Sequence, residues 1–247
     1  MNLEQLLVSR IMTANPRDLH VVERSFPITH FGRLEKSRVV TVGINPSVRE
    51  FFDGRKPARL LEEPLKRVLD RESIGIRDSD VPSIDDALKV LASYNQYFET
   101  GNHYSWFNAM QKWALDPLGV SYNKGSVAHL DLVQWATKPV WSGIKSKSVR
   151  EQLVLSDSRF LSEQIRMSRP ELVLFNGATV VKTMRQFGHF VVEQTGEIPG
   201  SRGFTYFVGR CGDARAVGWS INIQSQPDKE NSSKTALAKW LSAKVSI

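Results

Sequence analysis

The chain has 247 residues, and 41% of them are hydrophobic, which is typical of a folded globular protein and excludes an intrinsically disordered one. The formal net charge is +7, and a basic surface of this kind suits a polyanionic partner such as nucleic acid. Cys211 is the only cysteine, which excludes an internal disulfide and a cysteine cluster for zinc or iron–sulfur binding.

Apolar periodicity predicts helices that alternate with strands along the chain. Helices are predicted at about 2–13, 57–71, 84–98, 104–115, 157–169, 178–187 and 232–245, and strands at about 38–43, 127–133, 171–176, 190–193, 204–208 and 217–224. The basic segment 138–150 reads as a connection. The alternation predicts the α/β class, as a three-layer α/β/α sandwich with a mainly parallel central sheet, in a single domain over 1–247.

The strand at 38–43 is apolar and β-branched, and it runs directly into Ile44-Asn45-Pro46-Ser47. Open α/β sheets bind their ligands in the crevice outside the carboxyl ends of the strands. Asn45 is therefore expected at such a crevice, presented by a turn that Pro46 stiffens. The alternative is an ordinary strand-to-loop turn, in which Asn, Pro and Ser are common.

Four short motifs fall at or near the ends of predicted strands, namely 43–47, 130–133, 174–178 and 223–228. Their order and spacing resemble the uracil-DNA glycosylase superfamily, nearest its mismatch-specific and thymine-DNA glycosylase branch. The first motif of that branch is Gly-Ile-Asn-Pro-Gly, and its Phe-Asn-Gly turn is matched by 175–177. The resemblance spans about 38–245, while 53–103 has no counterpart and is interpreted as a helical insertion.

The resemblance implies a role for each residue that matches the first motif. Asn45 would hold the hydrolytic water against the anomeric carbon. Ile44 and Pro46 would line the pocket for the base, together with Ser47, which stands where the branch has glycine. Phe51 or Phe52 would stack on the flipped base.

The later motifs imply contacts with the base and with the DNA backbone. Asp131 lies where many family members place a side chain that reads the base. Gln226 begins the loop that grips DNA and assists the departing base, and as a neutral amide it supplies no cation. The residues expected to contact DNA are Asn176, Gly177, Ser225, Lys229, Asn231 and Ser232.

Asp131 suggests which base is released. An ionised carboxylate only accepts hydrogen bonds, so it suits the exocyclic amino group of cytosine better than the carbonyl oxygens of uracil or thymine. The best hypothesis is a 5-modified cytosine, as in phage DNA, removed in anti-phage defence. Asp131 could instead pair with an Arg or Lys inside the fold. It could also bond to His129, which lies on the same face of the strand.

We therefore expect a monofunctional DNA glycosylase that hydrolyses an N-glycosidic bond with water, needs no metal or organic cofactor, and acts as a monomer without an obligatory protein partner. The alternatives are a uracil or thymine mismatch glycosylase, a non-catalytic DNA-binding relative, and an unrelated α/β hydrolase of free nucleosides. The charged start of the chain and the lack of a long apolar run predict a cytoplasmic protein with no membrane contact, nucleoid-associated in a bacterium.

Overall fold

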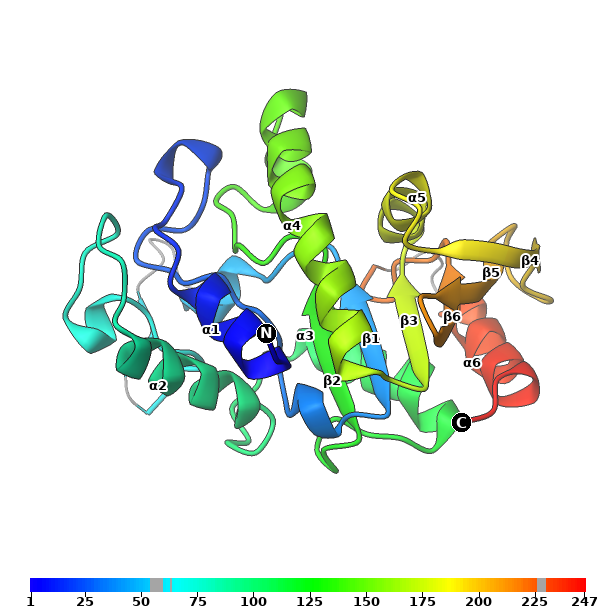
Figure 1. Ribbon diagram of the computed structural model, residues 1–247. Coiled ribbons are helices and arrows are strands. Elements are labelled where there is room, and N and C mark those ends of the chain that lie inside the picture. The colour runs from blue at the N-terminus through cyan, green and yellow to red at the C-terminus, as the bar shows by residue number, and fades with distance from the viewer. Residues whose placement is uncertain (54–59, 63, 226–229) are drawn as a thin grey trace.

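A computed structural model describes residues 1–53, 60–62, 64–225 and 230–247 (Figure 1). A single six-stranded sheet runs through the molecule in the order β2-β1-β3-β6-β5-β4. The first four of these strands are parallel, and β5 and β4 are antiparallel. This confirms the α/β class with a mainly parallel central sheet.

The three leading strands are β1 (Val39–Gly43), β2 (Val127–Asp131) and β3 (Leu172–Asn176), and every residue in them is buried. Burial of both faces is what near-continuous apolar runs predict for parallel strands. β6 (Ala214–Trp219) continues the parallel set, whereas β5 (Thr205–Cys211) and the exposed edge strand β4 (Val191–Glu197) extend it as a meander.

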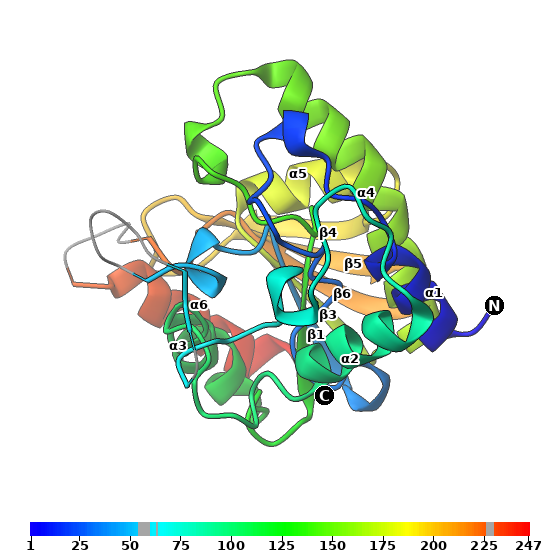
Figure 2. The same cartoon turned by 90° about the vertical axis from the view of Figure 1, so that its left-hand side faces the viewer.

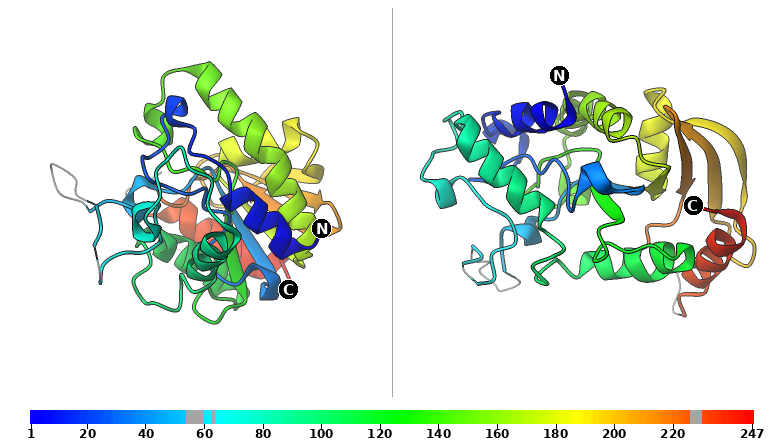
Figure 3. Two further views of the ribbon diagram at one scale, coloured as in Figure 1. Left: turned by 60° about the vertical axis from the view of Figure 1, so that its left-hand side comes forward. Right: turned by 60° about the horizontal axis from the view of Figure 1, so that its bottom comes forward.

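Helices cover both faces of the sheet (Figures 1 and 3). One layer holds α1 (Leu3–Ile11), α4 (Lys147–Ser168) and α5 (Ala178–Gln186). The other holds α6 (Ser232–Lys244) and α3 (Trp106–Met110), which continues into the π-helical turn η5 (Gln111–Leu115). α2 (Ile84–Asn95) packs against α1 beyond the β2 edge (Figures 1 and 2).

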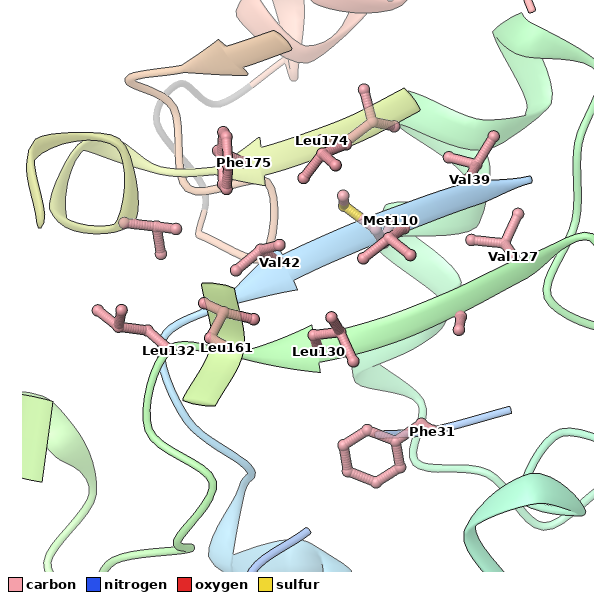
Figure 4. Packing of buried hydrophobic residues seen from close by; sticks show 14 of the residues in the cluster. Phe31, Val39, Val42, Met110, Val127, Leu130, Leu132, Leu161, Leu174 and Phe175 are labelled. Carbon is pink, nitrogen blue, oxygen red and sulfur yellow. The ribbon is translucent and has the colours of Figure 1, made fainter. Parts of the chain in front are cut away.

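The core is continuous through the sheet. Val42 of β1 and Leu174 of β3 belong to one buried cluster with Leu161 of α4 and Met110 of α3, which come from opposite layers (Figure 4). Each such side chain stabilises the fold by about 1.5–3 kcal/mol when fully buried. Cys211, at the end of β5, is also part of this cluster and is buried.

Two predictions about helices were wrong. The described part of 57–71 contains no α-helix, because tertiary contacts fix this segment as a loop. The Arg67 guanidinium donates to the carbonyls of Arg49 and Asn102, and that of Arg71 donates to the carbonyls of Ser25, Thr13 and Asp80. The segment 138–150 is not wholly a connection either, because α4 begins at Lys147, where Ser146 caps it.

Among the described residues of 53–103, α2 is the only α-helix, so the inserted region is mostly irregular chain. No helix in the described part of the protein is long and apolar enough to span a membrane.

The strand order fixes where a ligand can bind. β1 lies between β2 and β3, so the chain leaves β1 toward one side of the sheet and later returns to its other side. A reversal of this kind opens a crevice outside the carboxyl ends of the two strands at the switch point, here β1 and β3.

Candidate functional site

A cavity of about 280 Å³, which we call the outer cavity, lies at this switch point. Residues from the end of β1 and the turn after it, from the end of β3, from the loop after β2, from α3 and from the chain after β6 line it. They are Gly43, Ile44, Asn45, Pro46, Ser47, Val48, Trp106, Thr137, Val140, Trp141, Ser142, Asn176 and Asn222. The structure thus brings together four residues that the first motif singled out, and places Asn176 on the wall of the same cavity.

Asn45 has a fixed orientation. Its Nδ2 donates to the carbonyl oxygens of Pro46 (3.2 Å) and Trp135 (3.3 Å) and to Oγ1 of Thr137 (3.2 Å). Carbonyl oxygens only accept hydrogen bonds, so the amide nitrogen must face them and Oδ1 must face away. No donor among the described residues reaches Oδ1, which leaves it as an acceptor at the cavity wall.

A second, smaller cavity of about 30 Å³ adjoins the outer one, and we call it the inner cavity. The two share Asn45, Pro46, Ser47 and Trp106. The rest of the inner wall is made of four aromatic or imidazole rings and two carboxyl groups, from Phe31, Tyr104, Phe107, His129, Glu50 and Asp131. Its volume corresponds to about one water molecule.

Asp131 is the last residue of β2 and is only 3% exposed. Its Oδ1 lies 3.4 Å from Nε2 of His129, and no other charged partner or hydrogen-bond donor contacts it among the described residues. His129 and Asp131 therefore share a face, as predicted, and the alternative of an Arg or Lys partner finds no support there. Nδ1 of His129 is held by Oγ1 of Thr41 at 2.8 Å.

Glu50, which was not predicted as a site residue, is 2% exposed and lines the inner cavity. Its Oε2 accepts a hydrogen bond from the Tyr97 hydroxyl at 2.6 Å. Burial raises the pKa of Glu50 to about 8, and the charge of Asp131 adds to this. The spacing Ser47-x-x-Glu50 suggests a helix cap, but a charged residue directly before Phe51-Phe52 could have signalled a buried carboxyl.

The aromatic residues at the cavities differ from those expected. Phe51 is buried in the core, and Phe52 lines another cavity of about 760 Å³, where Nζ of Lys138 lies 5.0 Å from its ring centroid. Neither lines the cavities beside Asn45. Trp106 lines both of these, and Tyr104 lines the inner one, so they are the rings that a planar ligand at Asn45 would meet.

Asn176 acts mainly as a clamp. Its Oδ1 accepts from Nε1 of Trp219 (3.1 Å) and from the backbone N–H of Ile223 (3.2 Å), and its Nδ2 donates to Oε1 of Gln224 (2.7 Å). These bonds hold the chain after β6 against the end of β3. Gly177 turns directly into α5 with a φ of 95°, a conformation that favours glycine.

The last motif is described only in part. Ser225 is exposed and bonds to the carbonyl of Asn222, and Asn231 precedes Ser232, the first residue of α6. Gln226 and Lys229 lie outside the described residues. Within the described part of the chain, no group of three or more His, Cys, Asp or Glu side chains could hold a metal ion.

No model of a known protein family matches the sequence, and the comparison with curated proteins found no match.

Proposed function

We propose that this protein is a monofunctional DNA glycosylase, which uses water to cleave the N-glycosidic bond of a flipped pyrimidine and leaves an abasic site. The observation that carries the proposal is Asn45. It stands at the switch point of the sheet with its nitrogen tied to three oxygens and its Oδ1 available at the cavity.

This arrangement suits hydrolysis at an anomeric carbon. Such reactions pass through an oxocarbenium-like transition state, so the enzyme must place one water beside a sugar that gains positive charge. Oδ1 of Asn45 accepts a hydrogen bond from that water and orients it. Because the amide cannot take up a proton as a strong base, Asn45 acts by position, and the leaving base supplies much of the driving force.

The outer cavity has room for a base, and the inner one adjoins it. The outer cavity is close in size to the smallest pockets that enclose a small ligand, and Trp106 offers a ring for stacking. The acidic inner cavity favours a base with an amino group, which agrees with a 5-modified cytosine. The net charge of +7 supports a polyanionic partner, and we propose that DNA binds as the phosphate backbone around one flipped base.

The test is a base-release assay on DNA that carries uracil, mismatched thymine, cytosine, 5-hydroxymethylcytosine or glucosylated phage bases, with abasic sites scored by alkaline cleavage. We expect release of one modified cytosine by the wild-type protein and a loss of at least 100-fold in Asn45→Ala. Asn123→Ala is the matched control, because Asn123 is exposed in the loop before β2, at the other end of the sheet.

The other outcomes are equally informative. Release of uracil or thymine alone would make the protein a mismatch-repair glycosylase. No release from any DNA, with binding that weakens steeply as salt rises, would indicate a non-catalytic DNA-binding protein. Release that is identical in Asn45→Ala would contradict the role of Asn45.

A further inference from the structure

Two carboxyl groups from different elements face the inner cavity. Glu50 ends the 3-10 turn η3 (Val48–Glu50), and Asp131 ends β2. At 2% and 3% exposure, both are removed from bulk water. Buried carboxyl groups are normally satisfied by donors in the protein, so the partners of each oxygen show what a ligand would have to supply.

Asp131 lacks such donors. Among the described residues its one ion-pair partner is His129, whose Nε2 lies 3.4 Å from Oδ1, and no hydrogen-bond donor contacts the carboxylate. A buried carboxylate without hydrogen bonds is costly, and a ligand that donates an N–H to it would remove that cost. Asp131 is therefore an acceptor aimed into the cavity.

Glu50, in contrast to Asp131, can act as a hydrogen-bond donor toward the cavity. The Tyr97 hydroxyl accepts a hydrogen bond from the backbone N–H of Tyr104 (3.0 Å) and donates one to Oε2 of Glu50 (2.6 Å). Oε1 has no hydrogen-bond partner among the described residues. A neutral Glu50 would carry its proton there, as a donor toward the cavity.

We propose that Glu50 and Asp131 together read the Watson–Crick edge of a 4-amino pyrimidine, with Asp131 accepting from the exocyclic amino group and Glu50 donating to ring N3. This rests on the proposed function and names the class of base that it acts on. Uracil and thymine present a carbonyl oxygen and a ring N–H at the same positions, which is the reverse pattern at both. The base would lie against Trp106 in the outer cavity, with its edge turned to the inner one.

The groups around Glu50 favour its neutral form. Burial is the largest influence on its pKa, and the neighbouring charge of Asp131 also raises it, while the Tyr97 hydrogen bond and the charge of Arg67 lower it. The balance places the pKa at about 8. His129 and Tyr104 are the other titratable residues on the wall of the inner cavity. Glu50 therefore donates at neutral pH and stops donating in alkali.

The experiment compares single-turnover release of 4-amino and 4-oxo pyrimidines with the same 5-substituent, 5-hydroxymethylcytosine against 5-hydroxymethyluracil, between pH 6 and 9. Asp131→Asn replaces one of the two acceptor oxygens by an NH₂ donor. We therefore expect the preference for the amino base to fall by roughly tenfold to a hundredfold. Glu50→Gln donates at every pH, so the alkaline fall in the wild-type rate should disappear. Glu171→Gln, an exposed change just before β3, should show the wild-type preference and pH profile.

Binding of the same two DNAs, followed by fluorescence anisotropy, separates this inference from the proposed function. The wild-type protein could release no base and still bind the amino form more tightly. If Asp131→Asn then removes that preference, recognition of the base edge is supported and the proposed glycosylase activity is not. If base is released and neither variant changes preference or pH profile, the inference is wrong and the glycosylase is not. Thermal unfolding of each variant confirms that it is folded.

Discussion

Gly43 pairs with Asp131 across β1 and β2, and it has no side chain to fill the space beside that carboxylate. A Cβ at this position would lie 2.6 Å from Oδ1 of Asp131 and 3.0 Å from Nε2 of His129. Both contacts are too close, so one or both side chains would have to move. Because Gly43 has no side chain, Asp131 and His129 can keep their positions on the wall of the inner cavity.

Gly43→Ala should destabilise the fold by about 1–3 kcal/mol, the usual cost of overpacking a tight core, and should also weaken base release. Urea unfolding measures the first effect. In the Asp131→Ala background the same change should cost less, because one of the two obstructing groups is gone. An equal cost in both backgrounds would show that Asp131 is not what the new methyl group meets.

At the scale of elements, Asp157 joins three parts of the fold. It lies fully buried on α4, its Oδ1 contacts Nη2 of Arg10 from α1, and its Oδ2 accepts from the backbone N–H of Gln134 at 2.8 Å. Gln134 follows β2 and leads into Trp135 and Thr137, whose oxygens hold Asn45. Asp157 therefore supports the loop behind the candidate site from the far side.

Asp157→Ala should destabilise the protein by about 3–5 kcal/mol, because it leaves the largely buried Arg10 guanidinium without its counter-charge. The midpoint of chemical unfolding tests this. Glu151→Ala is the control on the same helix, since its ion pair with Lys147 is exposed, and its midpoint should stay at the wild-type value. Similar midpoints for both variants would contradict the structural role of Asp157.

Much of this element order can be read from the sequence, and the exceptions have a common cause. β1, β2 and β3 are short apolar runs bounded by turn residues, and α2 and α6 are close to their predicted ranges. The segment 57–71 has helical periodicity, yet Leu65 is 58% exposed and Arg67 is drawn inward to two carbonyls. Long-range contacts of this kind leave no local pattern.

Some residues of the candidate site can likewise be predicted from the sequence, and others cannot. The turn at Ile44–Ser47 and the face shared by His129 and Asp131 follow from strand periodicity, and these residues do meet at the cavities. Glu50 and Trp106 could not be placed, because their approach depends on how the loop after β1 packs against α3. Asn176 was expected to contact DNA, and the structure instead shows three hydrogen bonds of its side chain inside the fold.

Across the whole molecule, two buried groups oppose each other in their response to pH. Burial raises the pKa of Glu50 from 4.5 to about 8 and lowers that of His30 from 6.5 to about 4. The stabilising contribution of Glu50 is complete below about pH 4.5 and is lost as pH rises through about 8. That of His30 is complete above about pH 6.5 and is lost as pH falls through about 4.

Wild-type stability should therefore fall between pH 6 and pH 8.5 by a few kcal/mol, because the unfolded chain has released the Glu50 proton that the folded protein still binds. Glu50→Gln should flatten this alkaline slope and leave the acid slope in place. Urea unfolding at intervals from pH 5 to 8.5 provides the measurement. A wild-type slope that persists in Glu50→Gln would assign the effect to other groups.

The rate at which a thiol reagent labels Cys211 can report local opening of the fold. Burial at the end of β5 raises the pKa of its thiol to about 12, so the folded state offers thiol reagents almost no reactive thiolate. Its labelling rate would measure how often the β5–β6 pair opens, and no second cysteine in the sequence would contribute to that rate. A cysteine placed at Ser142, exposed on the rim of the outer cavity, could then carry a fluorophore in the otherwise native chain.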